Sequence, residues 1–563
     1  MARTVALGIQ DFRKLLENGY FYIDKTMFIK EWWESGDDVT LLTRPRRFGK
    51  TLAFSMLEQF FSVKYNDADL LFQHLDIWQE KAYQKLCGTY PVISLSFASV
   101  KETNFENARS KICQLIASEY ARCTFLLKGD ILSAPEKELF QRKAFDMNDV
   151  DATLSLNQLS EYLCRYYGKK VLILLDEYDT PMQEAYMHGY WDQLADFIRN
   201  LFNATFKTNP YLERAMLTGI TRISKESLFS DLNNLAVVTT TSNRYAAAFG
   251  FTEQEVFAAM DELALTEKEE VRRWYDGFIF GSCRDIYNPW SILNYFREKK
   301  FAAYWANTSS DHLISRLMRE SGPDTKMIME DLLSGQTFCT QLDEQVVFSQ
   351  LDHKASAVFS LLLASGYLRV NHTYFDRESG KTTYELGLTN MEVRLMFVQM
   401  IEEWFREYTP AYNQFIQALL LHDIDAMNEY MNQVSEELFS SFDTARKPSQ
   451  KSQPERFYHG FVLGLIVELS DRYVITSNRE SGFGRYDMML TPKKETDHAY
   501  LIEFKVYQPK KEASLEDTVQ TALAQIEEKH YDRELIKRGI PSAHIYKYGF
   551  AFEGKSVCIG SNR

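Results

Sequence analysis

Apolar positions in the first 310 residues alternate between short continuous runs and stretches with helical spacing. The run 171–175 contains no polar residue, which is typical of a parallel strand covered on both faces. Across residues 51–61, Leu52, Met56 and Phe60 recur at every fourth position, which predicts a helix. Further strands are predicted over residues 39–43, 92–97 and 215–219. This alternation indicates an α/β domain with a parallel sheet.

The pattern changes after residue 310. Residues 311–445 are mostly helical in spacing, with a small strand pair predicted over 367–370 and 382–386. The polar, proline-bounded segment 444–454 predicts a linker or exposed loop. The elements predicted after it are a helix over 455–469, strands over 473–476, 486–490 and 500–506, a helix over 515–529 and a strand over 546–552. We therefore expect three domains, over residues 1–310, 311–445 and 446–563.

Composition narrows the class of protein. A chain of 563 residues is too long for one core, and 45% hydrophobic with 25% charged residues is ordinary for a folded protein. The net charge of -14 argues against phosphate binding over the whole surface, although a local basic track remains compatible with it. Seven scattered cysteines without a C-x-x-C pair favour reduced thiols and a cytoplasmic location. No apolar run approaches the roughly 18 residues of a membrane span, so we expect no membrane partner.

A candidate phosphate-binding loop follows the first predicted strand. Gly49, Lys50 and Thr51 supply a glycine, a lysine and a hydroxyl in the order used to bind nucleotide phosphates and Mg²⁺. The first position of the loop is Arg44, where the general pattern has glycine. Such a short pattern also occurs in other strand-to-helix turns. The residues predicted to contact ATP are Arg46, Arg47, Phe48, Gly49, Lys50, Thr51 and Leu52, with Thr51 also on the Mg²⁺ ion.

Two carboxylates end the buried strand over 171–175. Asp176 is predicted to hold Mg²⁺, and Glu177 to activate the attacking water. The alternative is that both simply cap the next helix. Arg222 follows another predicted strand and is interpreted as a sensor of the γ-phosphate, with a surface salt bridge as the alternative.

Four motifs carry a resemblance to a known family. Residues 21–26 (FYIDKT), 44–52 (RPRRFGKTL), 176–179 (DEYD) and 287–290 (YNPW) resemble the AAA-ATPase-like family found mainly in bacteria. The resemblance covers roughly residues 5–310, and an arginine-proline start of the loop is usual in that family. It implies a P-loop fold of the additional-strand type that binds ATP. Such ATPases often assemble, so a homo-oligomer in which Arg46 or Arg47 serves a neighbouring subunit is one interpretation.

The segments 274–278 and 288–290 resemble the part of that family that follows the core sheet. We interpret them as a lid over the nucleotide. The helical region beyond them is interpreted either as a relay of nucleotide state to the C-terminal domain or as a rigid spacer.

A second set of charged residues lies near the C-terminus. Glu503 and Lys505 are two apart on a predicted strand, so both side chains leave the same face, and Asp487 precedes the neighbouring strand. Two carboxylates of this kind bind Mg²⁺ or Mn²⁺, which would activate a water and stabilise charge on a phosphodiester. Lys505 would orient that water or offset the extra negative charge. Without this context an E-x-K strand is usually an ion pair.

Residues 450–555 resemble the PD-(D/E)xK nuclease superfamily at Asp487, Glu503 and Lys505, with Tyr486 where the superfamily name has proline. The resemblance implies a restriction-endonuclease-like α/β domain with a further metal ligand on its first helix. Glu455 and His459 are the candidates for that ligand, and Gln525 is a candidate for a substrate or supporting contact. Basic residues that we interpret as nucleic-acid contacts or as a solvated face are Arg485, Lys493, Lys494 and Lys510.

The fold class expected is thus α/β multidomain: a P-loop NTPase parallel sheet, a helical middle region and a restriction-endonuclease-like domain. The function expected is an ATP-hydrolysing protein coupled to a metal-dependent nuclease for DNA or RNA, in defence, mobile-element biology or repair. The first alternative is an ATP-dependent signalling or scaffold switch whose nuclease-like domain binds nucleic acid without cutting. In a second alternative the P-loop domain binds nucleotide only structurally.

Overall fold

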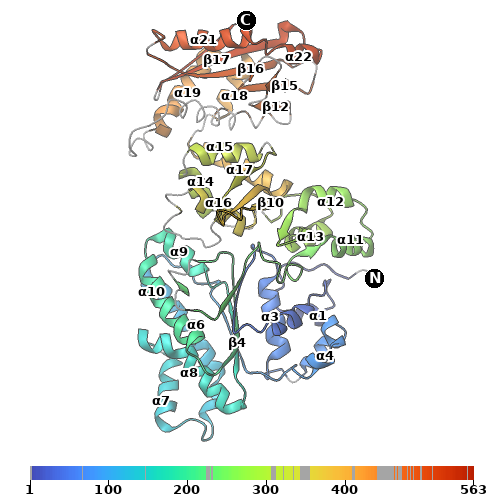
Figure 1. The fold of residues 1–563 in the computed structure, drawn as a ribbon, viewed down its shortest axis with the longest axis vertical. Coiled ribbons are helices and arrows are strands. Elements are labelled where there is room, and N and C mark those ends of the chain that lie inside the picture. The colour runs from blue at the N-terminus through green and yellow to red at the C-terminus, as the bar shows by residue number, and fades with distance from the viewer. Residues whose placement is uncertain are drawn as a thin grey trace. The chain divides into compact units, whose positions relative to one another are not determined.

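A five-stranded parallel sheet forms the centre of the N-terminal part, as the computed structural model shows (Figure 1). The strands are β1 (Val39–Thr43), β2 (Val92–Ser96), β3 (Val171–Asp176), β4 (Leu212–Gly219) and β5 (Leu235–Val238). They lie in the order β2-β3-β4-β1-β5 with every pairing parallel. The strands β1 and β3 are buried along their whole length, in agreement with their continuous apolar sequence.

The structure does not describe every residue of the chain. The described residues are 3–65, 67–145, 147–223, 228–229, 232–305, 312–320, 323–333, 335–342, 351, 355–408, 412–439, 462, 466, 469, 472–477, 480–481, 484–485, 487–494, 497–509, 511–553 and 556–562. The predicted linker 444–454, and with it Glu455 and His459, lies outside them.

Helices cover both faces of the N-terminal sheet (Figure 1). One face carries α1 (Phe12–Glu17) and α3 (Lys50–Phe61), and the other carries α6 (Phe105–Arg122), α8 (Asp149–Tyr167) and α10 (Trp191–Phe202). On the α3 face, Leu57 and Phe60 share a buried cluster with Leu42, Leu174 and Met216 of the strands. The remaining helices up to residue 202 are α2 (Met27–Glu34), α4 (Ala68–Phe72), α5 (Lys81–Gln84), α7 (Ala134–Lys143) and α9 (Thr180–His188).

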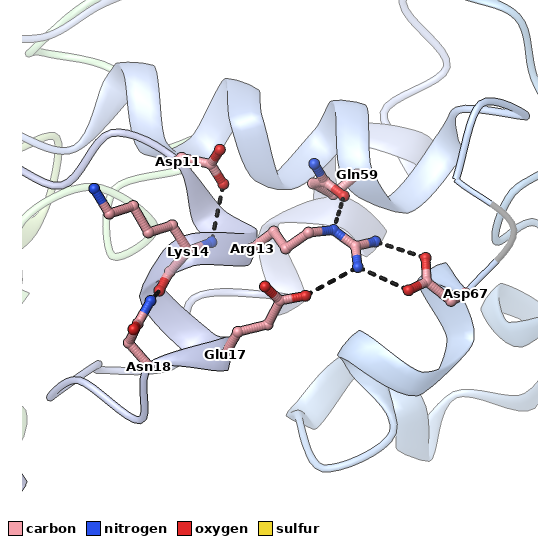
Figure 2. Close-up of polar contacts among 7 residues, drawn as sticks. All are labelled: Asp11, Arg13, Lys14, Glu17, Asn18, Gln59 and Asp67. Atoms are coloured by element: carbon pink, nitrogen blue, oxygen red, sulfur yellow. Dashed lines mark hydrogen bonds and ion pairs between the residues drawn. The ribbon is translucent and has the colours of Figure 1, made fainter.

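Arg13 ties three N-terminal segments together (Figure 2). Its guanidinium donates to Gln59 of α3 at 3.1 Å, to Glu17 of its own helix at 3.1 Å and to both carboxylate oxygens of Asp67 at 2.8 Å. The side chain of Asp11 accepts from the backbone N–H of Lys14 at 3.0 Å and so caps α1. These contacts hold α1 against α3, the helix that follows the candidate phosphate loop.

A second group of elements follows the sheet. It contains β6 (Phe251–Thr252), α11 (Glu253–Glu262), α12 (Lys268–Tyr275), β7 (Phe278–Phe280), β8 (Cys283–Tyr287) and α13 (Pro289–Glu298). The region beyond it contains α14 (His312–Glu320), α15 (Pro323–Leu333), β9 (Phe338–Thr340), α16 (Ala355–Ala364), β10 (Leu368–Phe375), β11 (Thr382–Leu388) and α17 (Met391–Tyr408). Its strand pair was predicted from the sequence, and β9 adds a third strand in the order β10-β11-β9.

A separate mixed sheet forms the C-terminal part, in the order β12-β15-β16-β17-β18. Its elements are α18 (Tyr412–Leu421), α19 (Ile424–Phe439), β12 (Tyr473–Ser477), β13 (Glu480–Ser481), β14 (Gly484–Arg485), β15 (Met488–Pro492), β16 (Ala499–Val506), α21 (Leu515–Glu528), α22 (Arg533–Lys537), β17 (Ile545–Glu553) and β18 (Ser556–Asn562). One face packs on α18 and α19, and the other on α21. The sequence pattern did not predict β18, the antiparallel edge strand that closes this sheet.

The α/β multidomain class is therefore confirmed, with an N-terminal parallel sheet, a mainly helical middle and a C-terminal mixed sheet. Residue contacts group the chain into two compact units. One unit comprises Met1–Leu317 with Gly335–Leu395, and the other comprises Met318–Ser334 with Met396–Arg563. In the described part of the chain, no helix combines the length and the apolar character that crossing a membrane requires.

Candidate nucleotide and nuclease sites

The candidate phosphate loop connects β1 to α3. Gly49, the N-cap residue directly before the helix, has φ +82° and Arg47 has φ +65°, so the backbone turns sharply just before the helix. The first N–H groups of a helix have no intrahelical partner, which makes this end suited to an anion. The Lys50 ammonium donates to the carbonyls of Arg44 and Pro45 at 2.8 Å each, and burial lowers its pKa. Both of these acceptors are neutral carbonyls, so a phosphate anion would be a stronger partner for the ammonium.

Arg44 explains why this loop lacks the usual first glycine. Its side chain is fully buried and donates to the carbonyl of Thr43 at 2.9 Å and to that of Thr239 at 2.7 Å. The guanidinium lies 4.5 Å from the centroid of the Phe280 ring. Arg44 thus connects the end of β1 to the segment after β5 and to β7, and these contacts hold the first residue of the loop in place.

The first carboxylate after β3 is held next to the loop. Asp176 accepts from the Thr51 hydroxyl at 2.6 Å and from the hydroxyl of Thr218 at the end of β4. It is buried, and its two carboxylate oxygens face hydroxyls contributed by two other elements. Thr51 and Asp176, which were predicted to share a Mg²⁺ ion, therefore lie together. Hydroxyl and carboxylate oxygens are the ligand types that Mg²⁺ prefers.

Glu177 comes directly after Asp176 and has φ +52°, a left-handed conformation that is uncommon for a residue with a side chain. Asp179 fixes the neighbouring turn, because one of its oxygens accepts from the N–H groups of Ile220 and Thr221 at 3.0 and 2.8 Å. A Cβ at Gly219 would lie 2.6 Å from Asp179, so only glycine fits there.

The segments interpreted as a lid pack on the phosphate loop. The Phe48 ring contacts the rings of Phe278 and Phe280 at centroid distances of 4.8 and 5.3 Å. The Arg47 guanidinium lies 4.6 Å from the centroid of the Trp290 ring. The carbonyl of Arg46 accepts from the side-chain amide of Asn288 at 3.3 Å and from the Trp305 indole at 3.1 Å.

Residues from the middle region reach the same loop. Glu392, at the start of α17, is fully buried and accepts from the Ser291 hydroxyl at 2.8 Å and from the backbone N–H of Trp305. Gly366 lies so close to the Pro45 ring that an added Cβ would approach it to 2.7 Å. The loop is therefore packed against segments more than 200 residues further along the chain.

Arg222 is placed differently from the other predicted ATP contacts. It follows β4 and lines a small pocket with Thr43, the threonines after β5 and the C-terminal part of α16. None of residues 46–52 lines this pocket. Sensing of the γ-phosphate by Arg222 stays a prediction.

The candidate nuclease residues meet at the β15–β16 hairpin. Glu503 lies on β16 with its side chain buried, and the backbone N–H of the next residue, Phe504, donates to Asp487 at 2.8 Å. The Nζ atom of Lys505 lies 3.5 Å from the Oε1 atom of Glu503. Burial, and then the negative charge of Asp487, raise the pKa of the Glu503 carboxyl. The amide of Gln525 on α21 donates to Glu503 and also reaches the Tyr531 hydroxyl at 3.4 Å.

One atom at this site favours a metal ion. The Oε2 atom of Glu503 is buried and has no hydrogen-bond partner in the part of the chain that the structure describes, although a buried carboxylate oxygen normally needs one. A divalent cation between Glu503 and Asp487 would satisfy it, so the residues present fit such an ion. Within the described part of the chain, no group of three histidine, cysteine or acidic residues is arranged to hold a metal. The predicted third ligands, Glu455 and His459, lie outside that part.

The predicted nucleic-acid contacts are only partly described. Lys493 and Lys494 are exposed after β15, whereas Lys510 lies outside the described residues and only the backbone of Arg485 is described. Their role stays a prediction.

Sequence reasoning did not select Thr218, Trp305 or Glu392. Thr218 could have been predicted, because it lies at the end of a strand next to β3 and its hydroxyl can donate a hydrogen bond to Asp176. Trp305 and Glu392 follow no motif, and only the tertiary structure brings Trp305 to the phosphate loop and Glu392 to Trp305.

Comparison with known families assigns the regions of the candidate nucleotide site and the candidate nuclease site to two different families. Residues 6–229 match the family described as Predicted AAA-ATPase, and residues 453–562 match the PD-(D/E)XK nuclease superfamily. The chain therefore combines an AAA-ATPase-like region with a region of the PD-(D/E)XK nuclease superfamily, which confirms both resemblances.

A relative from Azotobacter chroococcum mcd 1 is similar over nearly the whole chain. It is named "Uncharacterized protein in vnfD 5'region" and is 27% identical over 576 aligned positions, covering 99% of this chain and 98% of the relative. Its name gives a genomic position and no activity.

Proposed function

We propose that this protein binds and hydrolyses ATP and couples the nucleotide state to a metal-dependent phosphodiesterase that cleaves DNA or RNA. The observation that carries the nuclease half is the buried, unpartnered Oε2 atom of Glu503 beside Asp487 and Lys505. A domain that only binds nucleic acid has no need of a buried carboxylate with one oxygen unsatisfied.

In the ATP half, the N-terminal end of α3 and Lys50 bind the β- and γ-phosphates. Thr51 and Asp176 hold Mg²⁺, and Glu177 orients and deprotonates the attacking water. Residues of the loop that would contact the nucleotide are Arg46, Arg47, Phe48, Gly49 and Leu52. Support comes from the hydrogen bond between Thr51 and Asp176 and from the position of Glu177 directly after β3.

In the nuclease half, Asp487 and Glu503 hold Mg²⁺ or Mn²⁺, which supplies Lewis-acid activation of water and of the phosphodiester. Lys505 positions the attacking water and offsets negative charge. Gln525 orients Glu503 through its side-chain amide. Glu455 or His459 completes the ligand set, and Arg485, Lys493, Lys494 and Lys510 contact the nucleic-acid backbone.

We further propose three domains over residues 1–310, 311–445 and 446–563, and a cytoplasmic location in a bacterium. The seven cysteines form no disulfide, which agrees with a reducing compartment. The chemistry of an ATPase joined to a nuclease suits defence, mobile-element biology or repair. A homo-oligomer in which Arg46 or Arg47 reaches a neighbouring subunit belongs to the same proposal.

The test is cleavage of labelled single- and double-stranded DNA and RNA by the full-length protein with Mg²⁺ or Mn²⁺. We expect Glu503→Gln to lower the cleavage rate at least about 100-fold, because it removes a metal ligand. The matched control is Glu528→Gln, an exposed glutamate on α21, which should cleave like the wild type. A parallel assay measures ATP binding and turnover, which Lys50→Ala should abolish.

Cleavage that persists in Glu503→Gln would refute the assignment of the nuclease site. If no substrate is cleaved with any metal while nucleic acid still binds, the protein is instead a nucleotide-dependent binding switch. Anisotropy of the same labelled substrates, with and without ATP, measures that binding.

A further inference from the structure

The pocket that contains Arg222 brings one guanidinium together with several hydroxyl-bearing residues. Its lining includes Arg222 and five residues with hydroxyl groups, and it includes no acidic residue among those that the structure describes. The hydroxyl-bearing residues are Thr43, Thr239, Thr240, Thr241 and Ser360. Arginine and hydroxyl donors together match the oxygens of a phosphate group. The pocket is small and opens to solvent, so it suits the end group of a ligand rather than a whole nucleotide.

The backbone fixes Arg222 in place. The Tyr178 hydroxyl donates to the carbonyl of Thr221 at 2.7 Å and accepts from the N–H of Ile223 at 3.1 Å. The Thr221 hydroxyl donates to Asp179 at 2.7 Å. The residues on both sides of Arg222 are thus anchored to the buried side chains of Tyr178 and Asp179, which follow β3. Arg222 lines the pocket, and no described residue forms an ion pair or hydrogen bond with its guanidinium, so its donors are available to a ligand.

The pocket lies apart from the candidate ATP site. Leu42 and Leu174 belong to the core cluster on the α3 face, and Asp176 follows Leu174 in the same phase of β3. Thr43 is one residue out of phase with Leu42, so its side chain leaves the opposite face of the sheet. The ATP site and the pocket therefore use opposite faces at the same edge of the sheet.

We propose that this pocket is a second phosphate-binding site, in which Arg222 and the hydroxyls of Thr43 and Thr240 bind a phosphate group while the P-loop binds ATP. The proposal goes beyond the ATPase and nuclease activities. Two sources share this chemistry: inorganic phosphate, and the terminal 5′-phosphate of an oligonucleotide.

The experiment measures binding of radiolabelled inorganic phosphate to the full-length protein by equilibrium dialysis. We compare the wild type with Lys50→Ala, Arg222→Gln and the double variant. We expect Lys50→Ala to retain one phosphate site, and Arg222→Gln to weaken that site at least about tenfold, as loss of a charge-assisted donor predicts. Thr240→Val should weaken it less, and Arg297→Gln, an exposed arginine on α13, should have no effect.

Two controls keep the outcomes distinct. Circular dichroism and ATP binding test whether Arg222→Gln is folded, and Arg222→Lys provides a second variant that keeps the charge but loses the planar donor pair. A dinucleotide with and without a 5′-phosphate then identifies the source: competition by the phosphorylated form alone assigns the pocket to nucleic-acid ends. If neither dinucleotide competes, the pocket is a site for inorganic phosphate.

Loss of all phosphate binding in Lys50→Ala would overturn the proposal, and so would equal phosphate binding in Arg222→Gln and the wild type. Displacement of the Arg222-dependent phosphate by ATP would also overturn it, and would instead make Arg222 a γ-phosphate contact. Failure of ATP to bind at all would refute the ATPase assignment and leave the phosphate measurement in Lys50→Ala intact.

Discussion

Arg44 shows how one side chain changes the meaning of a motif. In sequence it is a departure from the glycine that begins a general phosphate loop, yet in the structure it is a buried clamp on the carbonyls of Thr43 and Thr239. Burial lowers the pKa of its guanidinium to about 9, so it remains charged at neutral pH. Its charge is compensated by carbonyl oxygens and by the face of Phe280.

We predict that Arg44→Gly destabilises the protein although it restores the general motif. The change leaves buried carbonyls unpaired and opens a cavity, so the free energy of unfolding should fall by about 3 kcal/mol. Urea denaturation followed by tryptophan fluorescence measures this, with the exposed Arg297→Ala as control. A variant as stable as the wild type would show that Arg44 does not act as a clamp.

A second prediction at this scale concerns Glu119 on α6. Burial raises the pKa of its carboxyl to about 7, whereas in the unfolded chain it titrates at about 4.5. As the pH rises between these two pKa values, Glu119 loses its proton in the unfolded chain before it does in the folded protein. The free energy of unfolding therefore falls over this pH range, and above the folded-state pKa it stays lowered by the full amount. Glu119→Gln should therefore raise the free energy of unfolding by about 2 kcal/mol at about pH 8 and change it little near pH 4.

Denaturation at the two pH values, beside the exposed Glu106→Gln on the same helix, checks this expectation. An equal effect of Glu119→Gln at both pH values would contradict it.

At the scale of elements, the phosphate loop is held from both sides. Arg13 fastens α1 to α3 behind the loop, while Trp305 and Glu392 connect its outer edge to α13 and α17 (Figure 2 shows the Arg13 contacts). The loop is therefore positioned by elements that are far from it in the chain. The same arrangement gives the middle region direct contact with the part of the molecule proposed to bind ATP.

We predict that Arg13→Ala lowers the melting temperature by about 2 °C, because it removes hydrogen bonds that join α1, α3 and Asp67. This decrease in melting temperature should be smaller at high salt, because salt screens the ion pair between Arg13 and Asp67. Differential scanning fluorimetry at low and high salt measures it. Arg3→Ala, which removes an exposed ion pair with Glu262, should have a smaller effect and serves as the control. A salt-independent loss in Arg13→Ala would assign the effect to packing instead.

At the scale of the whole molecule, the two proposed chemistries reside in different compact units. Helix α17 begins in the unit with the phosphate loop and continues into the unit with the nuclease residues, because the division falls after Leu395. The coupling that we propose between nucleotide and cleavage would therefore act between residues of different units.

We predict that Glu177→Gln binds ATP but turns it over at least about 100-fold more slowly, because the general base is lost. In this variant ATP should hold cleavage at the level of the ATP-bound state for the length of the assay, and cleavage without ATP should match the wild type. Time courses of ATP turnover and of nucleic-acid cleavage on the same samples test both halves. Unchanged turnover would show that Glu177 is not the base, and a purely structural nucleotide would then be favoured.

The sequence by itself determined four of the five strands of the N-terminal sheet, β1 to β4, together with the phosphate loop, the paired Asp176 and Glu177, and the trio Asp487, Glu503 and Lys505. These features depend on local spacing: apolar runs predict buried strands, and alternation places Glu503 and Lys505 on one face. The sequence pattern did not predict β5, an edge strand of only four residues. It also did not predict β18, because an edge strand with partial burial has a weak apolar pattern.

Only the tertiary structure decided what surrounds these motifs. The clamp made by Arg44, the contacts of Trp305 and Glu392 with the loop region, and the pocket around Arg222 all join residues that are distant in the chain. The orphaned oxygen of Glu503 is likewise visible only when burial and every neighbouring donor are known. Spacing along a chain fixes which way a side chain points, whereas its partners depend on how the elements pack.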